Sequence, residues 1–149
     1  MLKLTRKLMF AIEAVVDIAY NSGEHPVQSK DIAERQGIPR RYLEQVLQQL
    51  VRADILRGVR GPRGGYRLAR ERRRIPLGEI VRIVAGMTAD EDDEDTGSDL
   101  GRMVLQPLWL DLQEEALIKL DAVSVEDLCT TARRAGIDST ARKSADFNI

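Results

Sequence analysis

The segment "GVRGPRGGYRLARERRR", residues 58–74, restricts the fold more than any other part of the chain. It is too basic to lie in a core and too rich in glycine to form a helix. Its first part fits two short strands, over about 55–60 and 66–69, joined by a hairpin tip "GPRGG" whose backbone conformation glycine permits. The segment therefore predicts an exposed, positively charged hairpin, and the elements around it indicate what that hairpin binds.

Three helices are predicted ahead of the hairpin, over about residues 5–20, 29–36 and 40–53. Thr5 and Ser29 are expected to cap the first two helices, because their side chains can accept hydrogen bonds from free backbone N–H groups. Gly37 is expected to end the second helix, and Pro39 to occupy the first position of the third. The order helix, helix, turn, helix, hairpin predicts a winged helix-turn-helix domain, in which the hairpin is the wing.

The third predicted helix is amphipathic, with Leu43, Val46, Leu47 and Leu50 at the spacing of a buried face. The major groove of DNA admits one α-helix, where arginine pairs with guanine, glutamine with adenine, and glutamate with the amino group of cytosine. The polar face of this helix supplies the candidate major-groove residues: Arg40, Arg41, Glu44, Gln45 and Gln48. Which of them contacts a base and which contacts a phosphate stays open.

The wing supplies a second set of candidate DNA contacts, to the minor groove or to phosphates: Arg60, Arg63, Gly64, Gly65 and Tyr66. Arginine that enters a narrow minor groove responds to its width and its negative potential. The glycines are expected to let the backbone come close to DNA. Tyr66 either packs the wing against the body of the domain or contacts a phosphate. The arginines at 70 and 72–74 are expected to add to the positive field.

Formal charge is divided between the two halves of the chain. Residues 1–75 carry 16 Lys and Arg against 8 Asp and Glu, a balance of +8, whereas residues 76–149 carry 7 against 16, a balance of −9. This asymmetry favours a polyanion, double-stranded DNA, as the partner of the first half. The chain has no apolar run long enough to span a membrane, no clear signal peptide and a single cysteine, so we expect a cytoplasmic protein that binds no membrane.

The second half is predicted to contain a helix at "LGEIVRIVAG", a mobile acidic loop at about 88–99 and a long helix at about 105–122. The long helix is apolar on more than one face. In a chain this small it requires a second surface, which we take to be another copy of the same chain. The candidate dimerisation residues are Leu105, Leu108, Trp109, Leu112 and Ala116. Ser124 and Asp127 resemble a capping box, and Gly136 is the expected stop of the helix that follows.

The predicted fold class is therefore mainly α with a small β-wing: a winged helix-turn-helix DNA-binding domain plus a long C-terminal dimerisation helix. The first domain is expected over residues 1–75. The dimerisation region, which includes the acidic loop, is expected over 76–136, and a loose tail over 137–149.

The segment "SKDIAERQGIPRRYLEQVLQQLVRADILRGVRGPRGGYRLAR", residues 29–70, resembles the Rrf-type family of bacterial winged-helix regulators, which includes IscR, NsrR and CymR. The opening "LTRKLMFAIEAVVDIA" and the late "LW…LQEEALIKLDAVSVEDL" extend the resemblance over about residues 2–130. It implies a homodimeric transcription regulator, usually a repressor, that binds an imperfect palindrome. It further implies that the helix bearing "YLEQ" lies in the major groove, that the wing enters the minor groove, and that the long late helix makes the dimer.

Many members of that family hold an iron–sulfur cluster through three closely spaced cysteines between the fourth helix and the dimer helix. The corresponding interval here, "GMTADEDDEDTGSDLGRMV", contains no cysteine, and the one thiolate of Cys129 cannot supply the ligands of a cluster. We therefore predict no cluster, no other cofactor and no metal site. By analogy with members that lack the cluster, we expect a small-molecule effector or a partner enzyme, and a role in sulfur or cysteine metabolism.

Two alternative functions stay open. Cys129 is expected to be a small buried hydrophobe, but a redox-responsive regulator could sense through this thiol if it were exposed and had a low pKa. An RNA-binding module could use the basic half, although the deep, narrow major groove of duplex RNA argues against it. The acidic run at 90–95 lacks the ligand spacing of a calcium loop. One histidine and one cysteine far apart in the sequence form no convincing nucleophile pair, so no enzyme is predicted.

Overall fold

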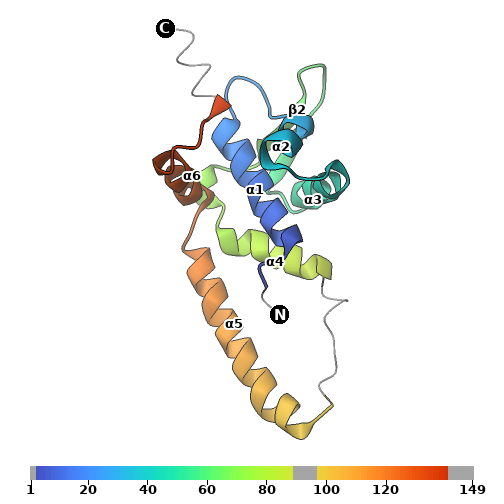
Figure 1. Ribbon diagram of the computed structural model, residues 1–149, viewed down its shortest axis with the longest axis vertical. Coiled ribbons are helices and arrows are strands. Elements are labelled where there is room, and N and C mark those ends of the chain that lie inside the picture. The colour runs from blue at the N-terminus through green and yellow to red at the C-terminus, as the bar shows by residue number, and fades with distance from the viewer. Residues whose placement is uncertain (1–2, 89–96, 141–149) are drawn as a thin grey trace.

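The computed structural model describes residues 3–88 and 97–140 of the chain. Its elements are α1 (Arg6–Asn21), α2 (Ser29–Gln36), α3 (Arg40–Arg52), β1 (Leu56–Val59), β2 (Gly65–Leu68), the short helix η1 (Arg72–Arg74), α4 (Leu77–Thr88), the π-helical turn η2 (Gly101–Leu105), α5 (Gln106–Asp121) and α6 (Val125–Arg134). In Figure 1, α1 runs through the centre, with α3 and the hairpin on one side of it and α6 on the other, while α5 projects away from the body. The fold is mainly helical with a two-stranded wing, which confirms the predicted fold class.

Helix α1 organises the core. Thr5 caps it as predicted, because the Thr5 hydroxyl accepts a hydrogen bond from the backbone N–H of Leu8 at 3.1 Å. Helices α2, α3, α4 and α6 and strand β2 all contact α1. One cluster of buried side chains extends from Leu8 in α1 through Ile80 in α4 to Cys129 in α6. The winged helix therefore shares a single core with the helices that follow it.

The capping positions of two helices differ by one residue from the prediction. Ser29 is the first residue of α2, and the capping position belongs to Gln28, whose carbonyl accepts the N–H of Ile32 at 3.2 Å. Pro39 likewise caps α3 instead of opening it, because its carbonyl already accepts the N–H of Leu43 at 3.1 Å. Neither Gln28 nor Pro39 makes a side-chain capping bond, so both helices rely on packing for their first turns.

The wing is an antiparallel pair in which Leu56 lies opposite Leu68 and Val59 opposite Gly65. Both strands were predicted, and each differs from its predicted range by one residue at each end. Tyr66 in β2 exchanges two backbone hydrogen bonds with Val27, of 2.8 and 3.0 Å. The α1–α2 loop thus continues the sheet on the far side of β2 and fixes the base of the wing to the body.

Arg67, also in β2, reinforces that attachment. Its guanidinium donates to the Ser22 hydroxyl at 3.1 Å and to the carbonyls of Gly23 at 3.3 Å and Glu24 at 2.9 Å. Since all three acceptors lie directly after α1, one arginine connects the wing to the end of the central helix.

The C-terminal end of α5 is clamped to α4. Arg82 in α4 donates two hydrogen bonds to the Asp121 carboxylate, of 2.6 and 3.0 Å. Gly78, one turn earlier in α4, is buried against the same carboxylate, and a Cβ at this position would collide with it. The backbone N–H of Leu77 also donates to the Val123 carbonyl at 2.7 Å, so the α5–α6 turn is held at the start of α4.

The signals predicted at the ends of α2 and α6 are confirmed. Ser124 and Asp127 form a complete capping box for α6, with hydrogen bonds of 2.9 and 3.1 Å. Gly37 and Gly136 follow α2 and α6 with φ of 64° and 79°, the left-handed conformation in which glycine ends a helix.

The described part of the predicted tail is bonded to α1. The hydroxyl of Ser139 donates to the Tyr20 carbonyl at 2.6 Å, and the N–H of Thr140 donates to the side-chain oxygen of Asn21 at 2.9 Å. The Tyr20 hydroxyl in turn donates to the carbonyl of Ile137. The expectation of a loose tail therefore fails for residues 137–140, because these hydrogen bonds join them to Tyr20 and Asn21 at the C-terminal end of α1. Residues 141–149, and residues 89–96 of the predicted acidic loop, lie outside the described ranges.

Candidate nucleic-acid interface

Helix α3 presents a polar face next to its buried one. The four leucine and valine side chains predicted to be buried are each at most 2% exposed, so the opposite side of the helix faces outward. All five candidate major-groove residues on that side are exposed: Arg40, Arg41, Glu44, Gln45 and Gln48. Among the described residues, none of these side chains has a hydrogen-bond or ion-pair partner. Their donors and acceptors are therefore available to an external partner.

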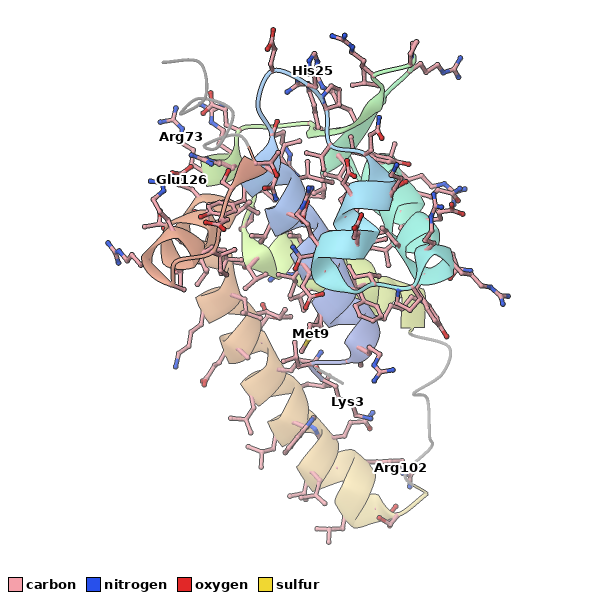
Figure 2. All side chains as sticks on the ribbon, turned by 45° about the horizontal axis from the view of Figure 1, so that its top comes forward. Lys3, Met9, His25, Arg73, Arg102 and Glu126 are labelled. Carbon is pink, nitrogen blue, oxygen red and sulfur yellow. The ribbon has the colours of Figure 1, made fainter. Side chains whose placement is uncertain are left out.

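The tip of the wing is similarly open. Arg60 and Arg63 are exposed, and neither is paired with a carboxylate in the described part of the chain. Gly61 between them has φ of 116°, a conformation that side chains rarely adopt. In Figure 2, long nitrogen-ended side chains extend from the hairpin and from α3 away from the body. The wing tip thus carries two charged groups on a turn that needs glycine for its shape.

Packing within the protein requires glycine at the two positions that follow the tip. A Cβ on Gly64 would collide with the carbonyl oxygen of Val59, and one on Gly65 with the carbonyl oxygen of Val27. Both glycines are half-buried between these backbone segments. Tyr66 is half-buried against the core, which corresponds to the packing role, one of its two predicted roles. Close backbone packing within the fold therefore accounts for these residues before any contact with DNA is considered.

The arginines that follow the wing differ from those at its tip. Arg70 pairs with Glu79 at 2.6 Å, Arg73 pairs with Glu71 at 2.6 Å, and Arg72 pairs with Glu126 of α6. Carboxylates of the same chain offset these charges. The segment at 70–73 therefore adds less to the positive field than its composition predicted, and serves to attach the wing to α4 and α6.

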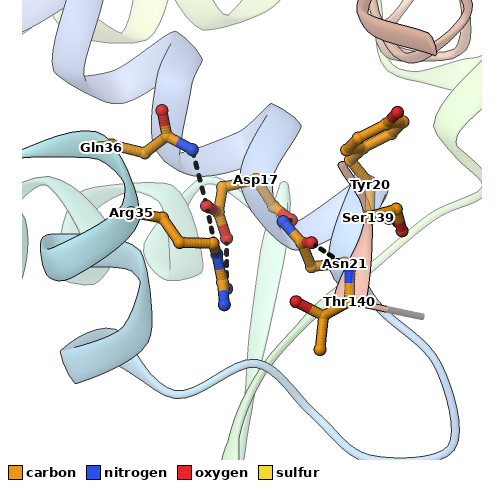
Figure 3. Close-up of polar contacts among 7 residues, drawn as sticks. All are labelled: Asp17, Tyr20, Asn21, Arg35, Gln36, Ser139 and Thr140. Carbon is orange, nitrogen blue, oxygen red and sulfur yellow. Dashed lines mark hydrogen bonds and ion pairs between the residues drawn. The ribbon is translucent and has the colours of Figure 1, made fainter. Parts of the chain in front are cut away.

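A buried carboxylate joins α1 to α2, the first two helices of the winged-helix domain. Asp17 in α1 is 2% exposed and accepts hydrogen bonds from Arg35 Nε at 3.0 Å, Arg35 Nη2 at 2.8 Å and Gln36 Nε2 at 2.8 Å (Figure 3). The hydrogen bonds that Arg35 donates to Asp17 raise the pKa of Arg35 above its ordinary value. This cluster was not predicted from the sequence, although an aspartate between Val16 and Ile18 in an apolar helix was a sign of it.

Helix α5 and the turn before it carry a continuous run of exposed apolar side chains. Leu105, Leu108, Trp109 and Leu112, four of the predicted dimerisation residues, are between 49% and 55% exposed, and Ala116 is half-buried. Met103 and Leu110, on other faces, are 73% and 57% exposed. Figure 2 shows α5 extending beyond the other helices with side chains all around it. Apolar surface of this extent is characteristic of an interface.

Cys129 is 1% exposed in α6, as predicted for a small buried hydrophobe, and burial raises the pKa of its thiol. A redox-sensing thiol needs exposure and a lowered pKa, so both observations oppose the redox alternative. The burial of Cys129 also argues against an iron–sulfur cluster, because this residue is the only cysteine of the chain and lies in the core. Residues 3–88 and 97–140 hold no group of three His, Cys, Asp or Glu side chains that could bind a metal ion. The residues present do not fit such a cluster.

Comparison with known proteins assigns this architecture. A sequence profile named Rrf2, described as "Iron-dependent Transcriptional regulator", matches residues 4–131. The chain belongs to the Rrf2 family. The HTH-type transcriptional regulator IscR of Xenorhabdus nematophila is 38% identical over 129 residues, which cover 85% of this chain and 79% of that protein. The regulator of the same name from Vibrio parahaemolyticus is 35% identical over 131 residues, 87% of this chain and 78% of that protein.

Solved structures of Rrf2 relatives have the same fold. IscR of T. potens superposes with a TM-score of 0.73 at 33% identity, over 93% of both chains. CymR, described as the global cysteine regulator of B. subtilis, superposes with a TM-score of 0.69 at 27% identity, over 88% of this chain and 98% of that one. These relatives are transcription regulators and not enzymes. Within the described ranges of the Rrf2 chain, no helix is both long enough and apolar enough to cross a bilayer.

Proposed function

We propose that this Rrf2-family regulator is a homodimeric repressor that binds an imperfect palindrome in double-stranded DNA. In each protomer α3 lies in the major groove, where Arg40, Arg41, Glu44, Gln45 and Gln48 contact base edges and phosphates. The wing tip places Arg60 and Arg63 in the minor groove or on phosphates. The observation that carries the proposal is that these side chains are exposed and have no partner in the described chain, whereas neighbouring arginines are paired.

The relative position of α3 and the wing supports simultaneous contact with DNA. Both lie on the side of α1 opposite α6 (Figure 1). The base of the wing is fixed to the α1–α2 loop through Tyr66 and Arg67, and α2 is fixed to α1 through Asp17. Helix α3 itself packs against α1, α2 and β1, so the groove helix and the wing are attached to the same body, as contact with neighbouring grooves requires.

The homodimer is proposed from α5. A monomer would leave the exposed apolar residues of α5 in water, whereas a second copy could cover them with the same face. A two-fold dimer presents two α3 helices, which matches the symmetry of a palindrome. Leu112→Asp would place a charge in that face, and we expect the variant to sediment as a folded monomer with weak affinity for DNA. A dimer of unchanged stability would contradict the assignment of α5.

The signal is proposed to be a small molecule or a partner enzyme, in place of a cluster. Cys129 is the only cysteine in the sequence, and it is buried where it cannot act as a cluster ligand. The likeness to CymR, titled the global cysteine regulator of B. subtilis, makes sulfur or cysteine metabolism the proposed area of regulation. A bacterial regulator that binds DNA acts in the cytoplasm.

The proposed function is tested by fluorescence polarisation of the purified protein. The labelled duplexes are the DNA upstream of its own gene and a scrambled sequence, each titrated at several salt concentrations. With about six phosphate contacts per dimer, affinity for the first duplex should fall roughly a thousandfold between 50 and 200 mM salt. Equal, weak affinity for both duplexes would count against a specific site in its own promoter. Tighter binding to a matched RNA duplex would replace the proposal with the RNA-binding alternative.

Specific recognition by α3 is tested through Gln45. Gln45→Ala should relax the base preference at one position of the site and leave dimerisation unchanged, because Gln45 is exposed and bonds to no described residue. An unchanged preference across a set of single-base variants would show that Gln45 contacts no base.

A further inference from the structure

A pocket of about 590 Å³ opens between α1, the end of α2, α6 and residues 137–138. Pockets that bind small molecules have volumes of about 300–1,000 Å³ and mostly apolar walls with a few polar groups. The apolar wall here consists of Ile12, Val16, Leu128, Ala132, Ala135 and Ile137. None of the candidate DNA-contacting residues of α3 and the wing tip lines the pocket.

Glu13 of α1 contributes a carboxylate to this apolar wall. It is half-buried, and among the described residues it has no hydrogen-bond or ion-pair partner. Burial raises the pKa of Glu13, which shows that its surroundings solvate the ionised form poorly. A cation placed in the pocket could form an ion pair with this carboxylate.

The other charged groups of the lining are already engaged. Asp17 and Arg35 neutralise each other, and Arg35 uses both Nε and Nη2 on Asp17 (Figure 3). Asp138 also lines the pocket and takes part in an interaction of its own. An anionic ligand would therefore meet the charge of Glu13 and would find Nε and Nη2 of Arg35 occupied by Asp17.

We propose that this pocket binds a small amphipathic amine, with its ammonium group against Glu13 and its hydrocarbon part on the apolar wall. The walls come from α1 and α2 of the helix-turn-helix and from α6, which follows α5. A bound amine would contact both parts, and its occupancy should change the affinity of the protein for DNA. This second step rests on the proposed function, whereas binding of the amine does not.

Calorimetric titration of the full chain without DNA tests the site. The probes share a phenyl ring and differ in their polar group: 2-phenylethylamine, 2-phenylethanol and 3-phenylpropionate. The amine should bind more tightly than the alcohol, and the acid least tightly. Glu13→Gln keeps the shape of the side chain and removes its charge, so it should weaken amine binding about tenfold and leave alcohol binding unchanged. Glu115→Gln makes the same change at an exposed carboxylate outside the pocket and should have no effect.

A second variant tests the apolar wall of the pocket without changing any charge. Ala132→Leu fills part of the apolar wall and should weaken binding of all three probes. The proposal is overturned if the amine binds no more tightly than the alcohol, if Glu13→Gln and Glu115→Gln behave alike, or if none of the probes binds. Preferred binding of the acid would overturn it as well, because it would indicate an anion site at Arg35.

The effect on DNA is measured separately, by polarisation of the promoter duplex with and without saturating 2-phenylethylamine. We expect the dissociation constant to change at least fivefold in the wild type and to stay constant in Glu13→Gln. An unchanged constant with the amine bound would overturn the coupling. If the duplex fails to bind both with and without the amine, the proposed function fails for this promoter, while the calorimetric result for the pocket still holds.

Discussion

The tip and the base of the wing have similar compositions and opposite surroundings. At the tip, Arg60 and Arg63 are exposed and have no partner in the described chain. At the base, Arg67 donates three hydrogen bonds to the end of α1, and Arg70 and Arg72 pair with carboxylates of α4 and α6. Arginine at the base holds the wing in place, and arginine at the tip is free to meet DNA. A count of the basic residues in this segment therefore combines two kinds of arginine: those that attach the wing to the body and those that stay exposed at its tip.

The largest expected effect is at the base. Gly65→Ala introduces a Cβ that collides with the backbone of Val27, so the wing must move away from the α1–α2 loop. We expect a loss of about 2–3 kcal/mol in the free energy of unfolding, measured by urea denaturation, together with weaker DNA binding. Gly58→Ala is the matched control, because a Cβ at Gly58 meets nothing within 4 Å. Equal losses for the two variants would show that the contact with Val27 is unimportant.

The next effect belongs to the tip. Arg63→Ala should weaken DNA binding several-fold for many sequences, and the slope of log affinity against log salt should decrease by about one per protomer. Its urea midpoint should match the wild type, because the side chain bonds to no described residue. A clear loss of stability without a change in the salt slope would reverse the roles assigned to tip and base.

A smaller effect is expected at Arg67. Arg67→Ala removes the hydrogen bonds to Ser22, Gly23 and Glu24, two of which are exposed, so the loss in the free energy of unfolding should be about 1 kcal/mol. The salt slope of DNA binding should stay close to the wild-type value, in contrast to Arg63→Ala. A decrease in the slope as large as that for Arg63→Ala would place Arg67 on a phosphate.

The smallest effect is expected for a paired arginine outside the wing. Arg82 holds the pKa of Asp121 below its ordinary value of 3.8 through their hydrogen bonds. The pair therefore stabilises the fold fully above the unfolded pKa, and this contribution is lost as pH falls below about 4 toward the lowered folded pKa. Both groups are exposed, so the effect is slight. Unfolding of Asp121→Asn, compared with wild type at pH 7 and pH 3, should show a larger difference at pH 7 than at pH 3.

The sequence predicted most of the fold because its signals are local. Periodic leucines and valines identified α3, Gly37 and Gly136 marked helix ends, and Ser124 with Asp127 identified the capping box of α6. The two capping residues that lie one position from their predicted places, Gln28 and Pro39, make no side-chain capping bond, and therefore no local signal marked them.

The features that the sequence did not reveal depend on distant contacts. The partners of Asp17 lie 18 and 19 residues away, and the partner of Tyr20 lies 117 residues away. Glycine at 65 suggested access to DNA, whereas its small size is required by a loop almost forty residues earlier. Local pattern identified the elements and the exposed face of α3, but only the tertiary structure separates arginines that hold the wing from those at its tip.

The clamp between α4 and α5 has a consequence for the proposed dimer. Helix α5 has 16 residues, so it is about 24 Å long, and Arg82, Asp121 and Gly78 fix it at one end. A rotation of α5 by a few degrees about its contact with Gly78 would therefore displace the far end of the helix by more than an ångström. In a two-fold dimer joined through α5, this angle sets the distance between the two α3 helices. The spacing of operator half-sites would then depend on how Gly78 packs against Asp121, far from the DNA.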